Sequence, residues 1–444
     1  MAEQDDPSGF RAGLRGLTTR GRAFLAAGLT AVVCSYLLGQ APLLRVGVLL
    51  AALPLAAAVL LVRTRYRVAS GRRLTPHRAT AGQEARVHLR VDNVSRVPTG
   101  LLMLEDMVPY VLGPRPRFVL DRVEPRGHRE VSYRVRSDLR GRYPLGPLRL
   151  RLSDPFGMCE LTRAFNASDV LTVVPQVLPL PAVRVSGEWA GYGESVSRAL
   201  AQAGDDDAVP REYRYGDDLR RVHWKSTAKY GELMVRREEQ PVRTRATVLL
   251  DTREIGHHGS GPAGSFEWAV SCAASVAVHL LERGFRTRLL TDTGESLPDT
   301  AGLTVGSVGE SVGLVLDALA AVGLSDRAGL DQAEEALRLE GEGLLVAILG
   351  TLDEERTASL GRLRRRAGTA VAFLLDTGSW TGLDRPLPND GRESDRPLRL
   401  LREAGWTVLP ARAGDAVPDL WRQLDRYAQA AGADRGPTRK GASG

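Results

Sequence analysis

The chain has 444 residues, of which 43% are hydrophobic and 25% charged, and its formal net charge is +7. These values exclude bulk disorder, a collagen-like fibre and a small disulfide-stapled secreted protein, and the length predicts two or three folded units. The first 73 residues hold ten arginines and three acids, which already amounts to +7. The charge-balanced remainder therefore gives no reason to expect nucleic-acid binding.

Two apolar runs near the N-terminus are long enough to cross a membrane. The run 23–39 carries no charge, and the run 42–62 carries only Arg45 near one end. A spanning helix needs about 20 apolar residues. Only two residues separate the runs, so the sequence predicts a transmembrane helical hairpin over 23–62. A cleaved signal peptide is the alternative for the first run, which lacks a convincing small-residue cleavage site.

Arginines flank this predicted hairpin at both of its outer ends. The positive-inside rule then predicts that both termini are cytoplasmic, that residues 1–22 form a basic cytoplasmic N-terminus, and that the protein resides in the plasma membrane as a multi-pass protein. The three cysteines fit no zinc or redox spacing, and we expect free thiols in a reducing compartment. They are Cys34, Cys159 and Cys272.

The next region has the short alternating patterns of β-structure. Apolar and polar residues alternate at 87–91, 131–135 and 148–152, and turn sequences separate these runs. This pattern predicts a small β-sandwich over 74–163, with a role in interaction or spacing. Residues 164–245 are interpreted as a connector, extended and proline-rich at 173–181.

From residue 246 onward, strands and helices alternate. Strands are predicted at 247–251, 285–292, 343–349, 369–376 and 406–410, and helices at 266–283, 311–322, 353–366, 398–404 and 416–430. Such alternation predicts right-handed βαβ units and a parallel sheet over 246–431, covered on both faces. The polar tail 432–444 is predicted to be disordered.

The densest group of charged and aromatic residues lies at 211–239. Two of the three lysines of the chain, Lys225 and Lys229, lie here four residues apart, on one face if the stretch is helical. Three interpretations stand side by side: a solvated structural network of ion pairs, a partner-docking surface rich in hot-spot residue types, or a phosphate or catalytic site. The last lacks the glycine-rich loop with lysine that phosphate binding favours.

The same segment resembles a known bacterial family, domain of unknown function 58. The resemblance rests on Arg-Glu-Tyr at 211–213, Gly-Asp-Asp at 216–218, Arg-Val-His-Trp-Lys at 221–225 and Leu-Met-Val-Arg at 233–236. Flanking matches are Arg-Gly-Arg-Tyr at 140–143 and Asp-Pro-Phe-Gly at 154–157, and the likeness spans roughly residues 20–430. Lys229 departs mildly from the pattern, because arginine is common there.

This resemblance implies an α+β multidomain protein: a transmembrane helical hairpin, a β-sandwich, and a C-terminal half similar to a von Willebrand factor A domain with its α/β parallel sheet. It further implies a membrane-anchored companion of a MoxR-type AAA+ ATPase. Because the sequence shows no catalytic constellation, we expect neither an enzymatic activity nor a cofactor. Residues expected to form the partner surface, through charge pairing and an aromatic anchor, are Arg211, Tyr213, Gly216, Asp217, Asp218, Arg221, Trp224, Lys225 and Arg236.

The von Willebrand likeness also raises the question of a metal. Such domains often bind a divalent cation through Asp-x-Ser-x-Ser, whereas here the stretch is Asp251-Thr-Arg253-Glu-Ile255. An arginine brings positive charge and isoleucine supplies no oxygen, so we expect a degenerate site without metal, in which Asp251 pairs with Arg253 or caps the next element. The adjacent pair His257-His258 is interpreted as part of a solvated, glycine-rich loop.

The function predicted from the sequence is therefore a cytoplasm-facing scaffold or adaptor, integral to the membrane, in an envelope-related or chaperone-like process. The alternatives are a hydrolytic enzyme acting on cell-envelope precursors, or a membrane protein that binds nucleic acid through 211–239. The first requires a nucleophile–base pair that the sequence does not reveal. The second predicts binding that weakens steeply with salt.

Overall fold

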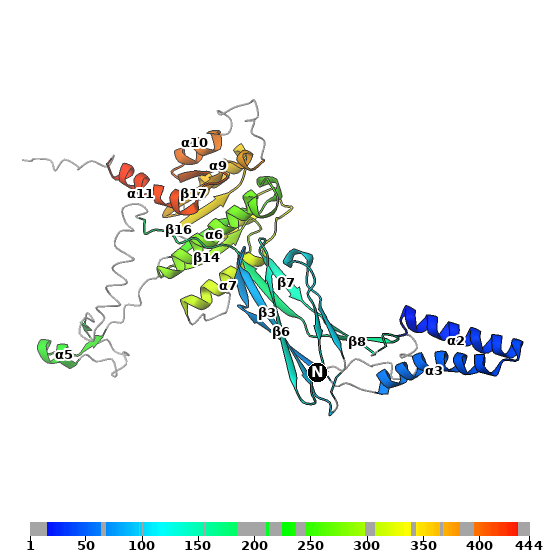
Figure 1. Ribbon diagram of the computed structural model, residues 1–444. Helices are drawn as coiled ribbons and strands as arrows, with labels where there is room; N and C mark the ends of the chain where they lie inside the picture. Colours follow the sequence, from blue (N-terminus) through cyan, green and yellow to red (C-terminus); the bar gives the residue numbers. More distant parts are fainter. Residues whose placement is uncertain are drawn as a thin grey trace, which may run out of the picture. The chain divides into compact units, whose positions relative to one another are not determined.

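The computed structural model describes residues 16–63, 68–96, 98–99, 101–154, 156–183, 210–212, 224–236, 245–297, 307–338, 343–364, 367–381 and 395–433. It is a mixed α and β structure with two N-terminal helices and several sheets (Figure 1). The chain divides into two compact units, Met1–Val174 (unit 1) and Pro175–Gly444 (unit 2).

Unit 1 begins with a helical hairpin formed by α2 (Thr19–Leu38) and α3 (Ala41–Arg63). The Thr18 side chain accepts a hydrogen bond from the Gly21 backbone at 3.2 Å, so α2 begins four residues before the apolar run. Gly39 ends α2 in the left-handed conformation, with φ of 65°. Both helices are long and apolar enough to cross a membrane.

Close backbone contact holds the two helices of the hairpin together. An ideal Cβ on Gly28 would lie 2.6 Å from the Ala51 backbone nitrogen, and one on Gly47 would lie 2.8 Å from that of Val32. Glycine at both positions permits this approach, as small residues do between helices in membranes.

The described part of unit 1 after the hairpin is mainly β-structure. Its strands are β1 (Val68–Thr75), β2 (Arg78–Thr80), β3 (Glu84–Asn93), β4 (Leu102–Asp106), β5 (Arg117–Leu120), β6 (His128–Arg136), β7 (Gly141–Leu145), β8 (Leu148–Ser153), β9 (Glu160–Phe165) and β10 (Asp169–Val174). They pair as β1-β3-β6, β2-β10-β7 and β5-β4-β8-β9. The three predicted alternating runs lie in β3, β6 and β8, whose alternate leucines and valines enter one shared core.

The segment predicted as a connector is structured in its described parts. Its first part, β10, pairs with β7 and β2 and so belongs to the β-structure of unit 1. The following residues pack on the core of unit 2: the Leu178 backbone N–H donates to Ser275 Oγ at 2.9 Å, and Trp421 Nε1 donates to the Pro181 carbonyl at 3.1 Å. Residues 185–209 of the predicted connector lie outside the described residues.

Unit 2 contains a six-stranded sheet in the order β15-β14-β13-β16-β17-β18. Neighbouring strands are parallel, except that β15 is antiparallel to β14. The elements in chain order are β13 (Arg245–Leu250), α6 (Ser265–Glu282), β14 (Arg286–Thr291), β15 (Ser296–Leu297), α7 (Val308–Ala321), α8 (Asp331–Arg338), β16 (Leu344–Leu349), α9 (Glu354–Arg364), β17 (Thr369–Leu375), α10 (Asp395–Glu403), β18 (Thr407–Ala411) and α11 (Val417–Ala433).

Helices cover both faces of this sheet, because successive strand residues point to opposite sides (Figure 1). On one face, Val248, Val346 and Phe373 pack with α6, α7 and α11. On the other face, Leu249 and Ala347 pack with α8, α9 and α10. The strands and helices predicted for this region are confirmed within a few residues at their ends. Helix α8 and the two-residue strand β15 were not predicted, since both are short and weakly patterned.

Candidate functional site

A buried ion pair lies at the carboxyl end of β13, where the sequence analysis placed a degenerate metal site. Arg253 Nε lies 2.8 Å from Asp251 Oδ1, and Arg253 Nη2 lies 2.7 Å from Oδ2. The side chains are 1% and 0% exposed, respectively. This is the two-point arrangement in which a guanidinium fits a carboxylate best. The expected pairing of Asp251 with Arg253 is confirmed.

Backbone groups satisfy the remaining hydrogen-bonding capacity of the pair. The N–H groups of Gly350 and Arg253 donate to the Asp251 carboxylate at 3.0 and 3.1 Å. Arg253 Nη2 also donates to the Thr351 carbonyl at 3.1 Å, and Nη1 to the Ala328 carbonyl at 3.3 Å. Burial opposes the charge on Arg253, but the hydrogen bonds and attraction from Asp251 outweigh it and raise the pKa of the guanidinium.

This pair occupies the switch point of the sheet. The chain passes from β13 to β14 on one side and from β16 to β17 on the other, so the order of strands reverses between β13 and β16. Doubly wound sheets bind ligands in the crevice at this point, outside the carboxyl ends of the strands. Here the turn η3 (Glu254–Gly256) closes over the crevice. The Thr351 N–H donates to the Gly256 carbonyl at 2.9 Å, and an ideal Cβ on Gly350 would lie 2.1 Å from that oxygen.

A second carboxylate flanks the pair. Asp292, directly after β14, accepts hydrogen bonds from the backbone N–H of Thr252 at 2.9 Å and from its hydroxyl. Asp292 Oδ2 is buried and has no hydrogen-bond partner within the described part of the chain. Sequence reasoning missed Asp292, although its place at the end of a neighbouring parallel strand is a usable signal.

These residues do not fit a divalent cation. The Arg253 guanidinium covers both oxygens of Asp251, which are the oxygens that a metal would need. The residues that the structure describes hold no group of three or more His, Cys, Asp or Glu side chains able to bind a metal. The switch point is thus filled by a side chain of the protein itself.

His257 differs from the solvated residue that the sequence analysis expected. Its ring is partly buried: Nε2 lies 2.8 Å from the Asp251 carbonyl oxygen, Nδ1 lies 3.3 Å from Ser265 Oγ, and the ring meets Phe266 edge-on. Burial lowers the pKa of His257. Only His258 is exposed as expected. Ser265 is 0% exposed, so this Ser–His contact offers no nucleophile to a substrate.

The signature segment contains a small strand–helix–strand arrangement. Strand β11 (Pro210–Glu212) pairs antiparallel with β12 (Met234–Arg236), and helix α5 (Trp224–Tyr230) lies between them in the chain. The Met234 N–H donates to Thr227 Oγ1 at 3.1 Å, and Gly231 turns the chain with φ of 77°. These contacts fix the end of α5 against β12.

The predicted surface residues are only partly described. Arg211 lies in β11 opposite Val235, and Arg236 lies in β12 opposite Pro210. Trp224 begins α5, and its side chain is 71% exposed. Lys225 and Lys229 both lie in this helix, so the stretch that carries the two lysines is helical. The remaining predicted residues lie outside the described part: Tyr213, Gly216, Asp217, Asp218 and Arg221.

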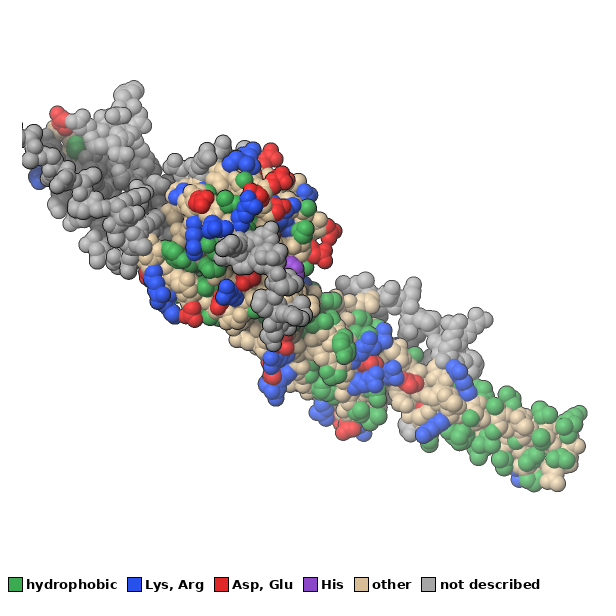
Figure 2. Space-filling view, turned by 90° about the horizontal axis from the view of Figure 1, so that it is seen from above, with side chains coloured by type: hydrophobic (Ala, Val, Ile, Leu, Met, Phe, Trp, Pro, Cys, Tyr) green, Lys and Arg blue, Asp and Glu red, His purple; other side chains and the backbone are tan. Residues whose placement is uncertain are grey.

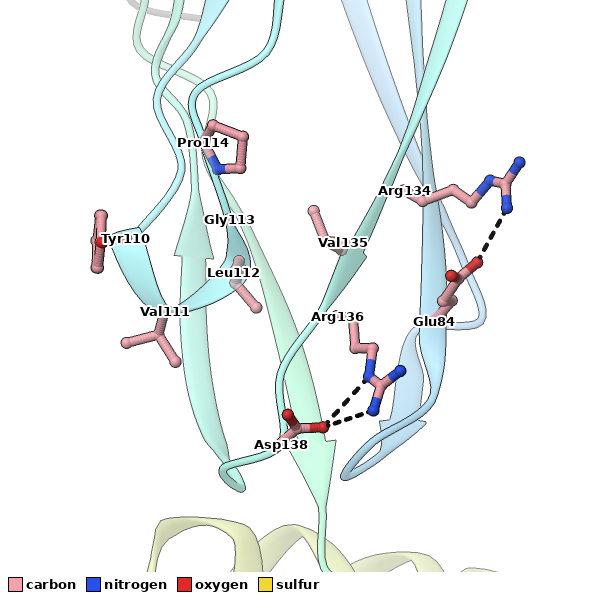
Figure 3. Close-up of a pocket in the computed structure, with 10 residues that line it drawn as sticks. All are labelled: Glu84, Tyr110, Val111, Leu112, Gly113, Pro114, Arg134, Val135, Arg136 and Asp138. Atoms are coloured by element: carbon pink, nitrogen blue, oxygen red, sulfur yellow. Dashed lines mark hydrogen bonds and ion pairs between the residues drawn. The ribbon is translucent and has the colours of Figure 1, made fainter. Parts of the chain in front are cut away.

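A groove on unit 1 is the other concave candidate (Figure 3). Glu84, Arg134, Arg136 and Asp138 line one side, and the loop 110–114 lines the other. Arg134 pairs with Glu84 at 3.3 Å, and Arg136 pairs with Asp138 at 3.0 Å. These charged groups are exposed and engage each other, so the groove offers no desolvated reactive group.

Comparison with known proteins shows a likeness to one family over part of the chain. Residues 209–392 match the model of the family described as "Protein of unknown function DUF58". The "Uncharacterized protein YeaD" of Bacillus subtilis is 28% identical over 155 residues, which are 35% of this chain and 37% of YeaD. The chain is therefore similar to the DUF58 family over residues 209–392. The match therefore spans little more than a third of the length of this curated relative.

Similar solved structures include the CARDB domain of a Pyrococcus furiosus protein and the ApaA protein of Bordetella pertussis. The first is 11% identical and covers 25% of this chain and 90% of its own, with a TM-score of 0.19. The second is 12% identical and covers 24% of this chain and 91% of its own, with a TM-score of 0.19. At these scores the likenesses carry no argument about fold or function.

Proposed function

We propose that the protein is a membrane-anchored scaffold or adaptor that faces the cytoplasm and binds a protein partner, a MoxR-type AAA+ ATPase. In this proposal the helical hairpin spans the membrane, and the β-structure of unit 1 forms a sandwich-like spacer. A von Willebrand A-like unit 2, together with the signature segment, contacts the partner. Nucleotide energy comes from the ATPase, while this protein supplies location and substrate contact.

The surface of the hairpin supports the membrane anchor. Leu29, Leu37 and Leu38 are 57%, 76% and 69% exposed, an arrangement that is costly in water and favourable in lipid. Figure 2 shows hydrophobic side chains gathered over the hairpin at the right-hand end of the view. Arginines before α2 and after α3 favour cytoplasmic ends.

The filled switch point supports a binding role for unit 2 over a metal-dependent or hydrolytic one. Asp251 is saturated by Arg253 and backbone N–H groups, and Ser265 is enclosed. A von Willebrand A-like sheet of this kind would contact its partner through its surface, without a bridging cation.

One observation carries the partner proposal: the indole of Trp224 is 71% exposed on α5, within the region that matches the family. A tryptophan loses apolar contact with water when a partner covers it, and Trp, Tyr and Arg are the residue types that dominate binding hot spots. Arg211 and Arg236 lie on the paired strands of the same segment.

The test is a pull-down of the full-length protein extracted from its native membrane in mild detergent, read by mass spectrometry. Wild type should recover an AAA+ ATPase, and Trp224→Ala should lose it. Tyr110→Ala is the matched control, because Tyr110 is an even more exposed aromatic residue, at 94%, on the other unit. No ATPase with wild type overturns the partner assignment. Equal recovery with Trp224→Ala overturns the assignment of the surface.

A further inference from the structure

The first helix begins on the β-structure of unit 1, held there by hydrogen bonds at its first turn. The Thr18 N–H donates to the Met158 carbonyl at 2.9 Å, and Thr18 Oγ1 donates to the Gly157 carbonyl at 2.8 Å. The Glu160 N–H donates to the Gly16 carbonyl at 2.7 Å, and Leu17 forms a β-bridge with Cys159. Residues 16–18 are therefore attached to the chain just before β9.

Packing reinforces this attachment at the open end of the hairpin. An ideal Cβ on Gly21 would lie 2.2 Å from the Met158 carbonyl oxygen, so α2 lies directly against this turn. Ala58, near the end of α3, is 1% exposed and belongs to the same buried cluster as Cys159 and the core of the β-structure. Both helices thus meet the β-structure through side-chain and backbone packing.

The residues 156–159 between β8 and β9, here named the Phe156 turn, have a fixed conformation. Asp154 accepts hydrogen bonds from the Phe156 N–H at 3.0 Å and from the Cys159 N–H at 2.6 Å. Gly157 has φ of 65°, which glycine adopts without strain. The Phe156 side chain points outward and is 62% exposed. The Phe156 turn therefore presents an apolar ring that a partner surface could cover.

The lengths of the helices place this turn relative to a bilayer. A hydrocarbon core about 30 Å thick takes about 20 residues of helix at about 1.5 Å each. If the hairpin tip at Gly39 lies at one surface of the hydrocarbon core, α2 reaches the other surface near its first turn, at Gly21. Arg20 and Arg22 are exposed at this level, and Arg20 Nη1 lies 4.0 Å from the ideal Cβ position of Gly157.

We infer that the Phe156 turn lies in the phospholipid headgroup layer, with the phenyl ring at the membrane interface and Arg20 and Arg22 among the lipid phosphates. Phenylalanine inserts at the boundary between headgroups and acyl chains, and arginines near helix ends reach toward the headgroups. The inference rests on the proposed membrane anchor. Unit 1 is then seated directly on the bilayer, because its β-structure and its first helix share a packed junction.

The test measures depth in the full-length protein, reconstituted in vesicles of phosphatidylcholine and phosphatidylglycerol. An NBD fluorophore is attached to Phe156→Cys in a Cys34→Ala background, since burial raises the pKa of the thiols of Cys159 and Cys272 and keeps them unreactive. Lipids carrying a nitroxide on the headgroup should quench this probe strongly, and lipids carrying it deep in the acyl chain should quench it less.

Two further positions calibrate the measurement. Val33→Cys, on an exposed face of α2, should be quenched most by the acyl-chain nitroxide. Tyr110→Cys should be quenched by neither, because Tyr110 follows Asp106, which pairs with Leu148, at the opposite end of β8 from the turn. If position 156 behaves like position 110 while position 33 is quenched, the inference is overturned and the anchor stands. If position 33 is also unquenched, both fail.

Discussion

The guanidinium of Arg253 donates two hydrogen bonds, of 2.8 and 2.7 Å, to the carboxylate of Asp251, and both side chains are buried at the carboxyl end of β13. Only one residue separates the two in sequence, so the cation is tethered to the same loop as the anion it neutralises. A buried carboxylate is costly without a partner. The loop after β13 therefore carries its own counter-charge.

Removing that counter-charge should destabilise the protein strongly. Arg253→Met leaves Asp251 buried and unpaired, which lowers the free energy of unfolding by about 3–5 kcal/mol. The double variant Asp251→Leu/Arg253→Met should lose much less. Arg396→Met is the control, because its pair with Glu354 is exposed and is worth about 1 kcal/mol or less. Denaturant unfolding of the detergent-solubilised chain gives the free energy of unfolding of wild type and of the three variants. Equal losses for Arg253→Met and Arg396→Met would contradict the burial argument.

The same geometry predicts that divalent cations do not bind through Asp251. Titration calorimetry with Mg²⁺, Mn²⁺ and Ca²⁺ should give the same heats for wild type and for Asp251→Asn. Cation binding at sub-millimolar concentration that disappears in Asp251→Asn would contradict this prediction, because it would show that a cation displaces Arg253 from the Asp251 carboxylate.

A methyl group at Gly350 should open the closed switch point. Its Cβ would lie 2.1 Å from the Gly256 carbonyl oxygen, so η3 has to move, and such overpacking costs about 1–3 kcal/mol. Gly309→Ala is the matched change, because that helical position has nothing within 4 Å of an ideal Cβ. Thermal unfolding should show a lower midpoint for Gly350→Ala and an unchanged or higher one for Gly309→Ala.

Stability should fall in mild acid, in part through His279. Burial, with repulsion from Arg283, lowers the pKa of His279 from 6.5 to about 4. Between these values the unfolded state binds more protons than the folded state, so stability is lost as pH falls from about 6.5 toward 4. His279→Gln should flatten this slope in urea titrations at several pH values, whereas exposed His258→Gln should leave it intact. An unchanged slope in His279→Gln would assign the acid sensitivity elsewhere.

Separating the hairpin helices should expose their facing surfaces. In Gly28→Ile the new Cβ would lie 2.6 Å from the Ala51 backbone nitrogen, so the bulky side chain pushes the two helices apart. The neighbouring Ala27 is exposed, so Ala27→Ile is the matched control. The rate at which maleimide modifies the half-buried Cys34 in micelles should rise in the first variant only. Equal rates would mean that the helices do not depend on this contact.

Local pattern predicted much of this architecture. Alternation at 87–91 and 131–135 identified β3 and β6, and the apolar strands of unit 2 identified its parallel sheet, because these signals come from neighbouring residues. The pairing of Asp251 with Arg253 was foreseen for the same reason. The attachment of Thr18 to Met158 was not foreseen, since it joins residues 140 positions apart and no local pattern records it.

The candidate surface at 211–239 remains a prediction for most of its residues. Trp224 is exposed as a docking residue should be. The helix that carries it was not predicted, because the lysine spacing indicated only that Lys225 and Lys229 would share a face if the stretch were helical. The burial of His257 was missed, because a glycine-rich sequence around a histidine is typical of a solvated loop. Its contacts with Asp251 and Ser265 arise only when β13 and α6 are brought together.

The scarcity of lysine makes α5 chemically distinctive. The chain has three lysines among 60 basic residues, and Lys225 and Lys229 both lie in this one short helix. Amine-directed crosslinkers can therefore react with side chains at α5 and, beyond it, only at Lys440. A crosslink from either helical lysine to another protein would report that this helix lies beside it, with almost no competing signal from the rest of the surface.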